Sequence, residues 1–261
     1  MQVAADAEPT TPITAQPLGK YWLFRGPAAY VPLTPWGPLS GSIAAVIVFL
    51  GAVLAVGTVL LMAHALGSRD EVLLNIVGTL AQQGAMIALT FYAASRFGGR
   101  VSAVLALRAP AQGPKAYPAA FALLIALALA MSATLQALDA QSLKGDMQVF
   151  QPMLQSRWWW LTFVLVGIGA PLSEELLCRG FLFSALAKSR LGNWGAALVS
   201  SAAFASVHFY SPLGMLLVFM IGMLLAWVLI RTGSLRVTMV CHALYNTLLA
   251  TLMVTGSLPQ T

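Results

Sequence analysis

Long stretches without any charged residue restrict what this chain can fold into more than any other feature. Residues 42–67, 73–95, 116–138, 191–230 and 237–261 contain no Asp, Glu, Lys or Arg. A helix needs about 20 apolar residues to cross a bilayer, and within lipid its backbone must satisfy its own hydrogen bonds. With 59% hydrophobic and 8% charged residues, the chain is predicted to be an all-α, polytopic transmembrane helical bundle.

Charges and prolines between the apolar stretches divide the bundle into about seven predicted spans. The pair Ser211-Pro212 splits the longest uncharged stretch, and Pro171 lies inside residues 158–187, which are long for one span. Proline removes a helix hydrogen bond, so we expect a kink or break there, and a full split would produce an eighth span. The spans are expected at residues 42–66, 72–95, 117–137, 158–187, 194–209, 213–230 and 235–254.

The same pattern predicts three regions. Residues 1–41 form a proline-rich N-terminal tail at the membrane interface. Residues 42–157 form accessory transmembrane helices, joined by a basic loop and, over residues 138–157, a polar connection. Residues 158–256 form the C-terminal core, which holds the polar motifs described below. The aromatic residues expected to anchor the tail at the interface are Trp22, Phe24, Tyr30 and Trp36.

The basic residues indicate how the bundle is oriented. The net charge of +6 is spread over short loops between apolar stretches, so we expect a lipid bilayer and no nucleic acid as partner. Seven spans with a cytoplasmic N-terminus leave only Arg69, Lys144 and Arg157 on the opposite side. We therefore expect an integral membrane protein with a cytoplasmic N-terminus, in the cytoplasmic (inner) membrane if the chain is bacterial.

Three further polar side chains inside predicted spans are expected to have no catalytic role. Cys178 and Cys241 lack the spacing of metal ligands, and we expect two small apolar thiols rather than a disulfide. His64 has no polar companion in the first span, so it is assigned a packing role.

Residues 173–180 read SEELLCRG and place two carboxylates inside the fourth span. An acidic residue at the centre of a transmembrane helix costs about 2.5–3.5 kcal/mol and therefore usually has a function. Arg179 lies four residues after Glu175 on the same helix face and can pair with it, whereas Glu174 points about 100° away. Glu175 is therefore predicted to have a structural role and Glu174 a chemical one. The alternative is a helix end whose carboxylates reach the lipid headgroups.

Two histidines are each paired with a polar or aromatic residue at helical spacing. His208 follows Phe204 by four residues, and His242 precedes Asn246 by four. A glutamate, two imidazoles and a carboxamide suffice for peptide hydrolysis, with Glu174 as general base toward water and Asn246 as donor to the oxyanion. The imidazoles can hold the water or bind a metal such as zinc. The metal ligands would be Glu174, His208 and His242, and the sequence leaves both mechanisms open.

Together these patterns resemble the EExxxR, FxxxH and HxxxN motifs of one family, the CAAX protease and bacteriocin-processing (CPBP, Abi-type) intramembrane proteases. The resemblance covers about residues 158–250. It implies a hydrolase that cleaves a peptide bond of a membrane-associated protein or peptide, with a lipidated substrate as one option. It also implies catalytic roles for Glu174, His208, His242 and Asn246, and supporting roles for Glu175, Arg179 and Phe204.

Two other functions are consistent with the same residues. A non-catalytic membrane scaffold or bacteriocin-immunity protein would keep the polar pocket for binding alone. A proton- or cation-coupled transporter would use the Glu–His cluster as a relay, but transporters often contain inverted repeats, and none is visible in this sequence. The endopeptidase is therefore the favoured prediction.

Overall fold

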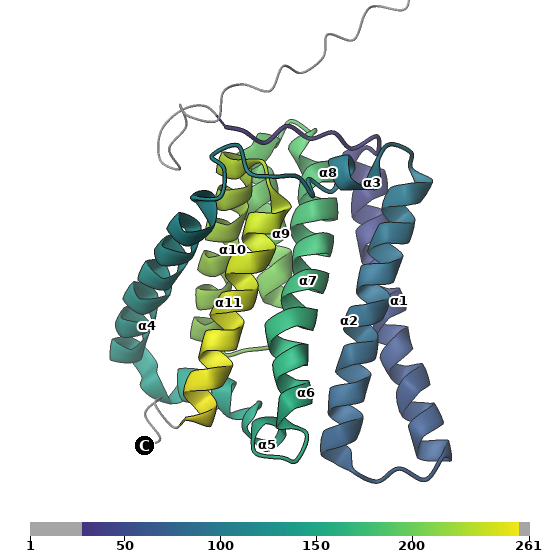
Figure 1. Cartoon of the computed structure of the whole chain (residues 1–261), viewed down its shortest axis with the longest axis vertical. Coiled ribbons are helices and arrows are strands. Elements are labelled where there is room, and N and C mark those ends of the chain that lie inside the picture. The colour runs from purple at the N-terminus through teal and green to yellow at the C-terminus, as the bar shows by residue number, and fades with distance from the viewer. Residues whose placement is uncertain (1–27, 256–261) are drawn as a thin grey trace, which may run out of the picture.

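The computed structural model describes residues 28–255, which form an all-α bundle without a strand. In Figure 1, α4 lies at one side, α9–α11 come next, the long α6–α8 element follows, and α1 and α2 lie at the other side. The helices are α1 (Pro38–Ala65), α2 (Glu71–Arg96), α3 (Val101–Val104), α4 (Ala116–Gln148), α5 (Gln151–Leu154), α6 (Trp159–Val164), η1 (Leu165–Gly169), α7 (Ala170–Glu174), η2 (Glu175–Leu182), α8 (Phe183–Ala187), α9 (Gly192–Ser206), α10 (Pro212–Thr232) and α11 (Leu235–Val254), where η marks a π-helical segment.

The span predicted at residues 158–187 is one continuous helix. The elements α6, η1, α7, η2 and α8 follow one another without a loop, and together they make a single candidate membrane span, Trp159–Ala187. Pro171 does not break it, because the π-helical turn before it changes the hydrogen-bonding register instead. Of the expected kink or break, no break forms, and residues 158–187 do not split into an eighth span.

Helix α9 is shorter than the span predicted at residues 194–209. Its 15 residues reach about 22 Å at 1.5 Å per residue, against a hydrocarbon core of about 30 Å. Among the described residues, 6 helices are long and apolar enough to cross a membrane, and α9 is not one of them. In Figure 1 the α9–α10 connection lies above the level at which α1, α2 and α11 end. The expectation of about seven spans thus becomes six full-length helices and one short one.

The connections hold more helix than the sequence indicated. Residues 138–157 were expected to be a polar connection, but α4 continues to Gln148 and α5 follows at once. A backbone break at Asp139, with φ −158° and ψ 89°, separates the apolar part of α4 from this helical extension. The basic loop contains α3, and Leu105 beside it is fully buried.

The Asp70 carboxylate joins the start of α2 to the start of the central helix, the continuous element from α6 to α8. Asp70 caps α2 by accepting the N–H of Leu73, and its other carboxylate oxygen accepts from Trp158 Nε1 and Arg157 Nη2, both at 3.0 Å. These bonds, that from Trp158 first, lower the pKa of Asp70 to about 2. The Arg157–Asp70 pair and the Trp158 ring thus join the two helices at the end of the bundle opposite α3 (Figure 1).

The described part of the N-terminal region lies over the bundle and contributes to its core. Trp36 stacks on Phe181 with ring centroids 4.4 Å apart, and Tyr30 meets Phe183 edge-on at 5.2 Å. Burial raises the pKa of the Tyr30 hydroxyl above its usual range. Backbone N–H groups of Ala29 and Tyr30 also donate to the carbonyl at the end of α10.

The interpretation of Tyr30 and Trp36 as interfacial anchors is therefore wrong. They are only 4% and 2% exposed, so protein atoms surround both rings where headgroups were expected. The sequence pattern misled because an aromatic residue has the same signature at an interface and in a core. Trp22 and Phe24 lie outside the described residues.

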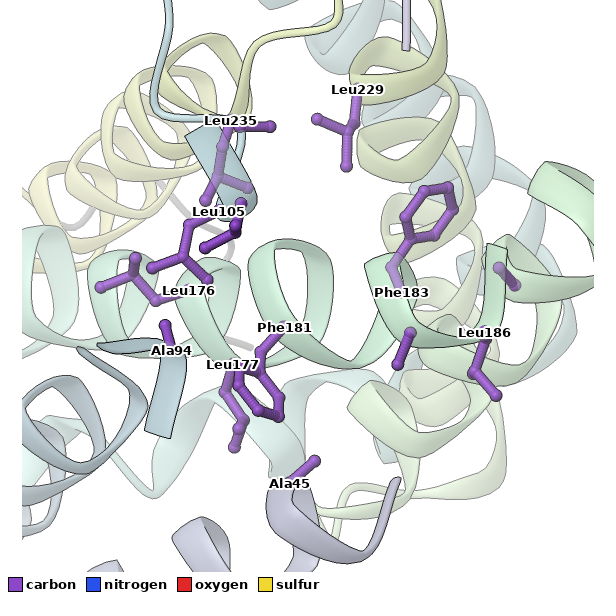
Figure 2. Close-up of a cluster of buried hydrophobic side chains, with 14 of the residues drawn as sticks. Ala45, Ala94, Leu105, Leu176, Leu177, Phe181, Phe183, Leu186, Leu229 and Leu235 are labelled. Atoms are coloured by element: carbon purple, nitrogen blue, oxygen red, sulfur yellow. The ribbon is translucent and has the colours of Figure 1, made fainter. Parts of the chain in front are cut away.

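The largest hydrophobic core surrounds η2 and α8. Figure 2 shows Leu176, Leu177 and Phe181 of the central helix among side chains from α1, α2 and α11, including Ala45, Ala94 and Leu235. A second core joins α4, α10 and α11. Cys178 and Cys241 are free thiols, as predicted. The central helix therefore has packed partners on both sides, which fixes the polar residues that it carries.

Replacing Trp36 by Ala is expected to destabilise the fold by about 3–5 kcal/mol, because it removes a large buried ring and leaves a cavity. Thermal unfolding in detergent would measure the loss. Trp194→Ala is the matched control, since this ring is 59% exposed. An equal loss in both variants would contradict the packing described here.

Candidate active site

A buried ionic network joins the fourth span to the last helix. Glu175 and Arg179 are both 0% exposed, and Arg179 Nη1 donates to Glu175 Oε1 at 3.0 Å. The same oxygen lies 3.2 Å from His242 Nδ1. The spacing of four residues on one helix predicted the first contact, and the contact with His242 adds a residue from α11. Glu175 thus holds the His242 ring in place.

The contact with Glu175 also decides which nitrogen of His242 faces the rest of the site. An ionised carboxylate only accepts hydrogen bonds, so Nδ1 carries the proton and donates it to Glu175. Nε2 of a neutral ring is then an acceptor. It lies 3.7 Å from Glu174 Oε2, and the Glu174 side chain is 22% exposed. That distance is too long for a direct hydrogen bond, so the two polar atoms approach each other without bonding.

Phe204 lies between the charged network and both histidines. Its ring is 4.2 Å from Arg179 Cζ, and it meets the rings of His208 and His242 edge-on at 4.7 and 5.9 Å. Such cation–π and edge contacts are favourable when they are desolvated. Phe204 was expected to be a supporting residue, and it supports by connecting three of the other motif positions.

His208 has its own backbone partner. Its Nδ1 lies 2.8 Å from the Phe204 carbonyl, and since a carbonyl only accepts, Nδ1 is the donor and Nε2 stays free. Among the described residues, His208 has no direct hydrogen bond or ion pair with Glu174 or His242, and Phe204 forms the link between them.

Asn246 completes the set one turn along α11. Its Nδ2 donates to the Val166 carbonyl in η1 at 3.1 Å. The carboxamide keeps a second N–H and its oxygen for other partners. The motif residues lie on α7, η2, α9, α11 and the start of the α9–α10 connection. Direct contacts join Glu175, Arg179, Phe204, His208 and His242. Glu174 lies 3.7 Å from His242, and Asn246 lies one turn after His242 on α11.

The three residues expected as metal ligands do not all approach one another. In the part of the chain that the structure describes, no three His, Cys, Asp or Glu side chains are grouped to hold one. Of the three proposed ligands, Glu174 and His242 approach each other, and His208 reaches them only through Phe204. His64 lies apart, exposed beside Glu71 and Asn75.

Asp146, at the end of α4, anchors the connection that carries His208. Its two carboxylate oxygens accept from the N–H and the hydroxyl of Ser211 at 2.8 and 2.7 Å. The Ser211 hydroxyl in turn caps α10 by accepting from the N–H of Gly214. The Tyr210 ring packs against His208 at 5.4 Å. An accessory helix thus fixes the loop on which one candidate residue lies.

Comparison with known families identifies the same part of the chain. Residues 156–248 match the family model described as Type II CAAX prenyl endopeptidase Rce1-like. The C-terminal helices resemble the Rce1-like proteases. All three motifs fall inside this Rce1-like segment, which confirms the resemblance to the CPBP family and supports a protease activity. No curated protein and no solved structure matches the chain.

Two polar residues near the site lie outside the Rce1-like segment, and the sequence analysis missed both. Asp146 was assigned to a polar connection, and Gln83 was not noticed inside the second span. Gln83 is 6% exposed, and its Nε2 donates to the Leu165 carbonyl in η1. A polar amide side chain inside a predicted span was the available signal for Gln83.

Glu175→Ala and Arg179→Ala are each expected to lower stability by about 3–5 kcal/mol, because each leaves an uncompensated buried charge. Thermal unfolding in detergent would measure it. Arg157→Ala breaks an ion pair whose arginine side chain is 72% exposed, so its effect should be much smaller. Melts of the two buried-pair variants that match the wild type would contradict a structural role for this network.

Proposed function

We propose that this protein is an intramembrane endopeptidase that hydrolyses a peptide bond of a membrane-associated protein or peptide with water activated by Glu174. One observation carries the proposal: Glu174 Oε2 and His242 Nε2 lie 3.7 Å apart, too far for a direct hydrogen bond. A water molecule has two protons to donate and can satisfy both. Its oxygen would then point a lone pair away from both groups, toward a substrate carbonyl.

The chemistry follows from that position of the water. As its oxygen bonds to the carbonyl carbon of the scissile peptide, one proton passes to the Glu174 carboxylate. The second N–H of Asn246 donates to the oxyanion that develops. When the C–N bond breaks, the proton on Glu174 passes to the leaving nitrogen, giving a carboxylic acid and an amine. His208 contributes its free Nε2 as a further hydrogen-bond partner.

Glu175, Arg179 and Phe204 act through His242 rather than on substrate. The Arg179 cation keeps the Glu175 carboxylate ionised, so Glu175 accepts from His242 Nδ1 and leaves Nε2 free for the water. Phe204 covers the guanidinium and both imidazoles, which excludes bulk water from the network. The ionic network therefore selects the protonation state that the proposed mechanism requires.

The bundle is proposed to lie in the cytoplasmic membrane with its N-terminus in the cytoplasm. Basic residues support this orientation. One end of the bundle, where α3 and α8 lie in Figure 1, holds Arg96, Arg100, Arg108, Lys115, Lys188, Arg190, Arg231 and Arg236, and the other holds Arg69, Lys144 and Arg157. A peptide bearing a lipid chain would be held by the bilayer itself near the site, so a prenylated substrate is favoured.

Glu174→Gln, His208→Ala and His242→Ala are each expected to reduce cleavage by at least about 100-fold, the usual contribution of general acid–base catalysis. The assay would follow a prenylated peptide ending in a Cys-aliphatic-aliphatic-Xaa sequence, with the protein in liposomes. Glu71→Gln and His64→Ala are matched controls, because both residues lie apart from the site, and they should retain full activity.

The same assay separates the competing mechanisms and functions. A chelator should leave the rate unchanged if Glu174 alone activates the water, and a loss that zinc restores would contradict that mechanism. Full activity in any of the three site variants would refute the assignment of that residue. Wild-type protein that moves protons across the liposome membrane without cleaving peptide would instead indicate a transporter.

A further inference from the structure

A proline leaves one carbonyl of the central helix without a helical donor. In η1 the N–H of Ala170 bonds to the Leu165 carbonyl, five residues back. By the same register the Val166 carbonyl would take the N–H of residue 171, but that residue is Pro171 and has none. The donor that Val166 would have in an α-helix is Ala170, which is already used. Val166 therefore needs a donor from outside the helix.

Asn246 supplies that donor from α11, as its Nδ2 lies 3.1 Å from the Val166 oxygen. Close packing of the two helices makes the contact possible. A Cβ on Gly167 would lie 2.5 Å from Thr247 Oγ1, so a larger residue here would force the Thr247 side chain to move. The missing N–H and the glycine next to Val166 together form a docking point for a side-chain amide.

Gln83 supports the neighbouring carbonyl from the other side. Its Nε2 donates to Leu165 at 3.1 Å, which makes Leu165 a double acceptor. A Cβ on Gly169 would lie 1.9 Å from Gln83 Oε1, and this oxygen is buried without a hydrogen-bond partner. Gln83 therefore packs its amide against Gly169 while it donates to the Leu165 carbonyl.

We propose that Pro171 is a positioning residue for Asn246, and that Gln83 stabilises the π-helical turn that makes this possible. One N–H of the Asn246 side chain donates to the Val166 carbonyl. This bond fixes the plane of the carboxamide and so sets the direction of its second N–H. The orientation of Asn246, the proposed donor to the oxyanion, thus depends on the backbone N–H that Pro171 lacks on the central helix. This inference rests on the proposed function only for the role of Asn246 in the reaction.

Pro171→Ala is the decisive variant, because it restores an N–H on the central helix that can donate to the Val166 carbonyl and so weaken its bond to Asn246. The direct measurement is nuclear magnetic resonance of side-chain amides in detergent after selective ¹⁵N-asparagine labelling. The asparagines of the chain are Asn75, Asn193 and Asn246, so assignment needs few variants. We expect the Asn246 amide signals to shift and to exchange faster with solvent, while those of Asn75 and Asn193 stay unchanged.

The kinetic measurement uses the prenylated-peptide assay. Pro171→Ala is expected to lower kcat by about two- to twelvefold, which corresponds to one neutral hydrogen bond, with KM unchanged. Gln83→Leu should act in the same direction on kcat. Pro118→Ala is the matched control: Pro118 lies in the first turn of α4, where an added N–H has no helical acceptor to capture.

Each outcome decides a separate point. Asn246 signals that are unchanged in Pro171→Ala would overturn the inference, whatever happens to activity. Shifted signals together with a lower kcat would support it. Shifted signals with unchanged kcat would refute positioning for catalysis and, if Asn246→Ala is also fully active, would remove Asn246 from the proposed mechanism. Effects of equal size in Pro118→Ala would also overturn it.

Discussion

The buried contact between Glu175, Arg179 and His242 is the interaction on which the rest of this structure depends. A charged pair at 0% exposure is tolerable in a bilayer only if each member has a partner, and here the partners come from a single turn of helix and from α11. The Glu175–Arg179 pair therefore has effects beyond the neutralisation of its two charges. It fixes where the last helix lies, which imidazole nitrogen carries the proton, and which way the other nitrogen faces.

Much of this arrangement follows from the sequence, because lipid imposes strict rules. Uncharged runs of sufficient length must be helices, and the spacing of Glu175 and Arg179 requires them to share a face. The motif residues on these helices were candidates for that reason, whereas Gln83 and Asp146 were not. The ends of the spans were also close, because prolines and capping residues such as Asp70 and Ser211 mark helix starts.

What the sequence did not reveal depends on contacts between segments far apart in the chain. Gln83 and Asp146 reach the site from accessory helices, and nothing local to either residue predicts its acceptor or donor. The burial of Trp36 depends on the position of Phe181, more than a hundred residues later in the sequence. The π-helical turn η1 directly precedes the helix that contains Pro171, and Asn246 of α11 donates to a carbonyl in this turn.

The shortness of α9 has a consequence for the surrounding lipid. A 15-residue helix packed beside the 21-residue α10 gives the bundle a lower hydrophobic thickness on one flank, and a bilayer accommodates such mismatch by thinning locally. This change in thickness occurs at the end of α9, where His208 lies in the α9–α10 connection. The next residue, Phe209, is 89% exposed and has a left-handed backbone φ of 52°. Acyl-chain length and sterol content thereby become physical variables acting on that loop, independent of any soluble ligand.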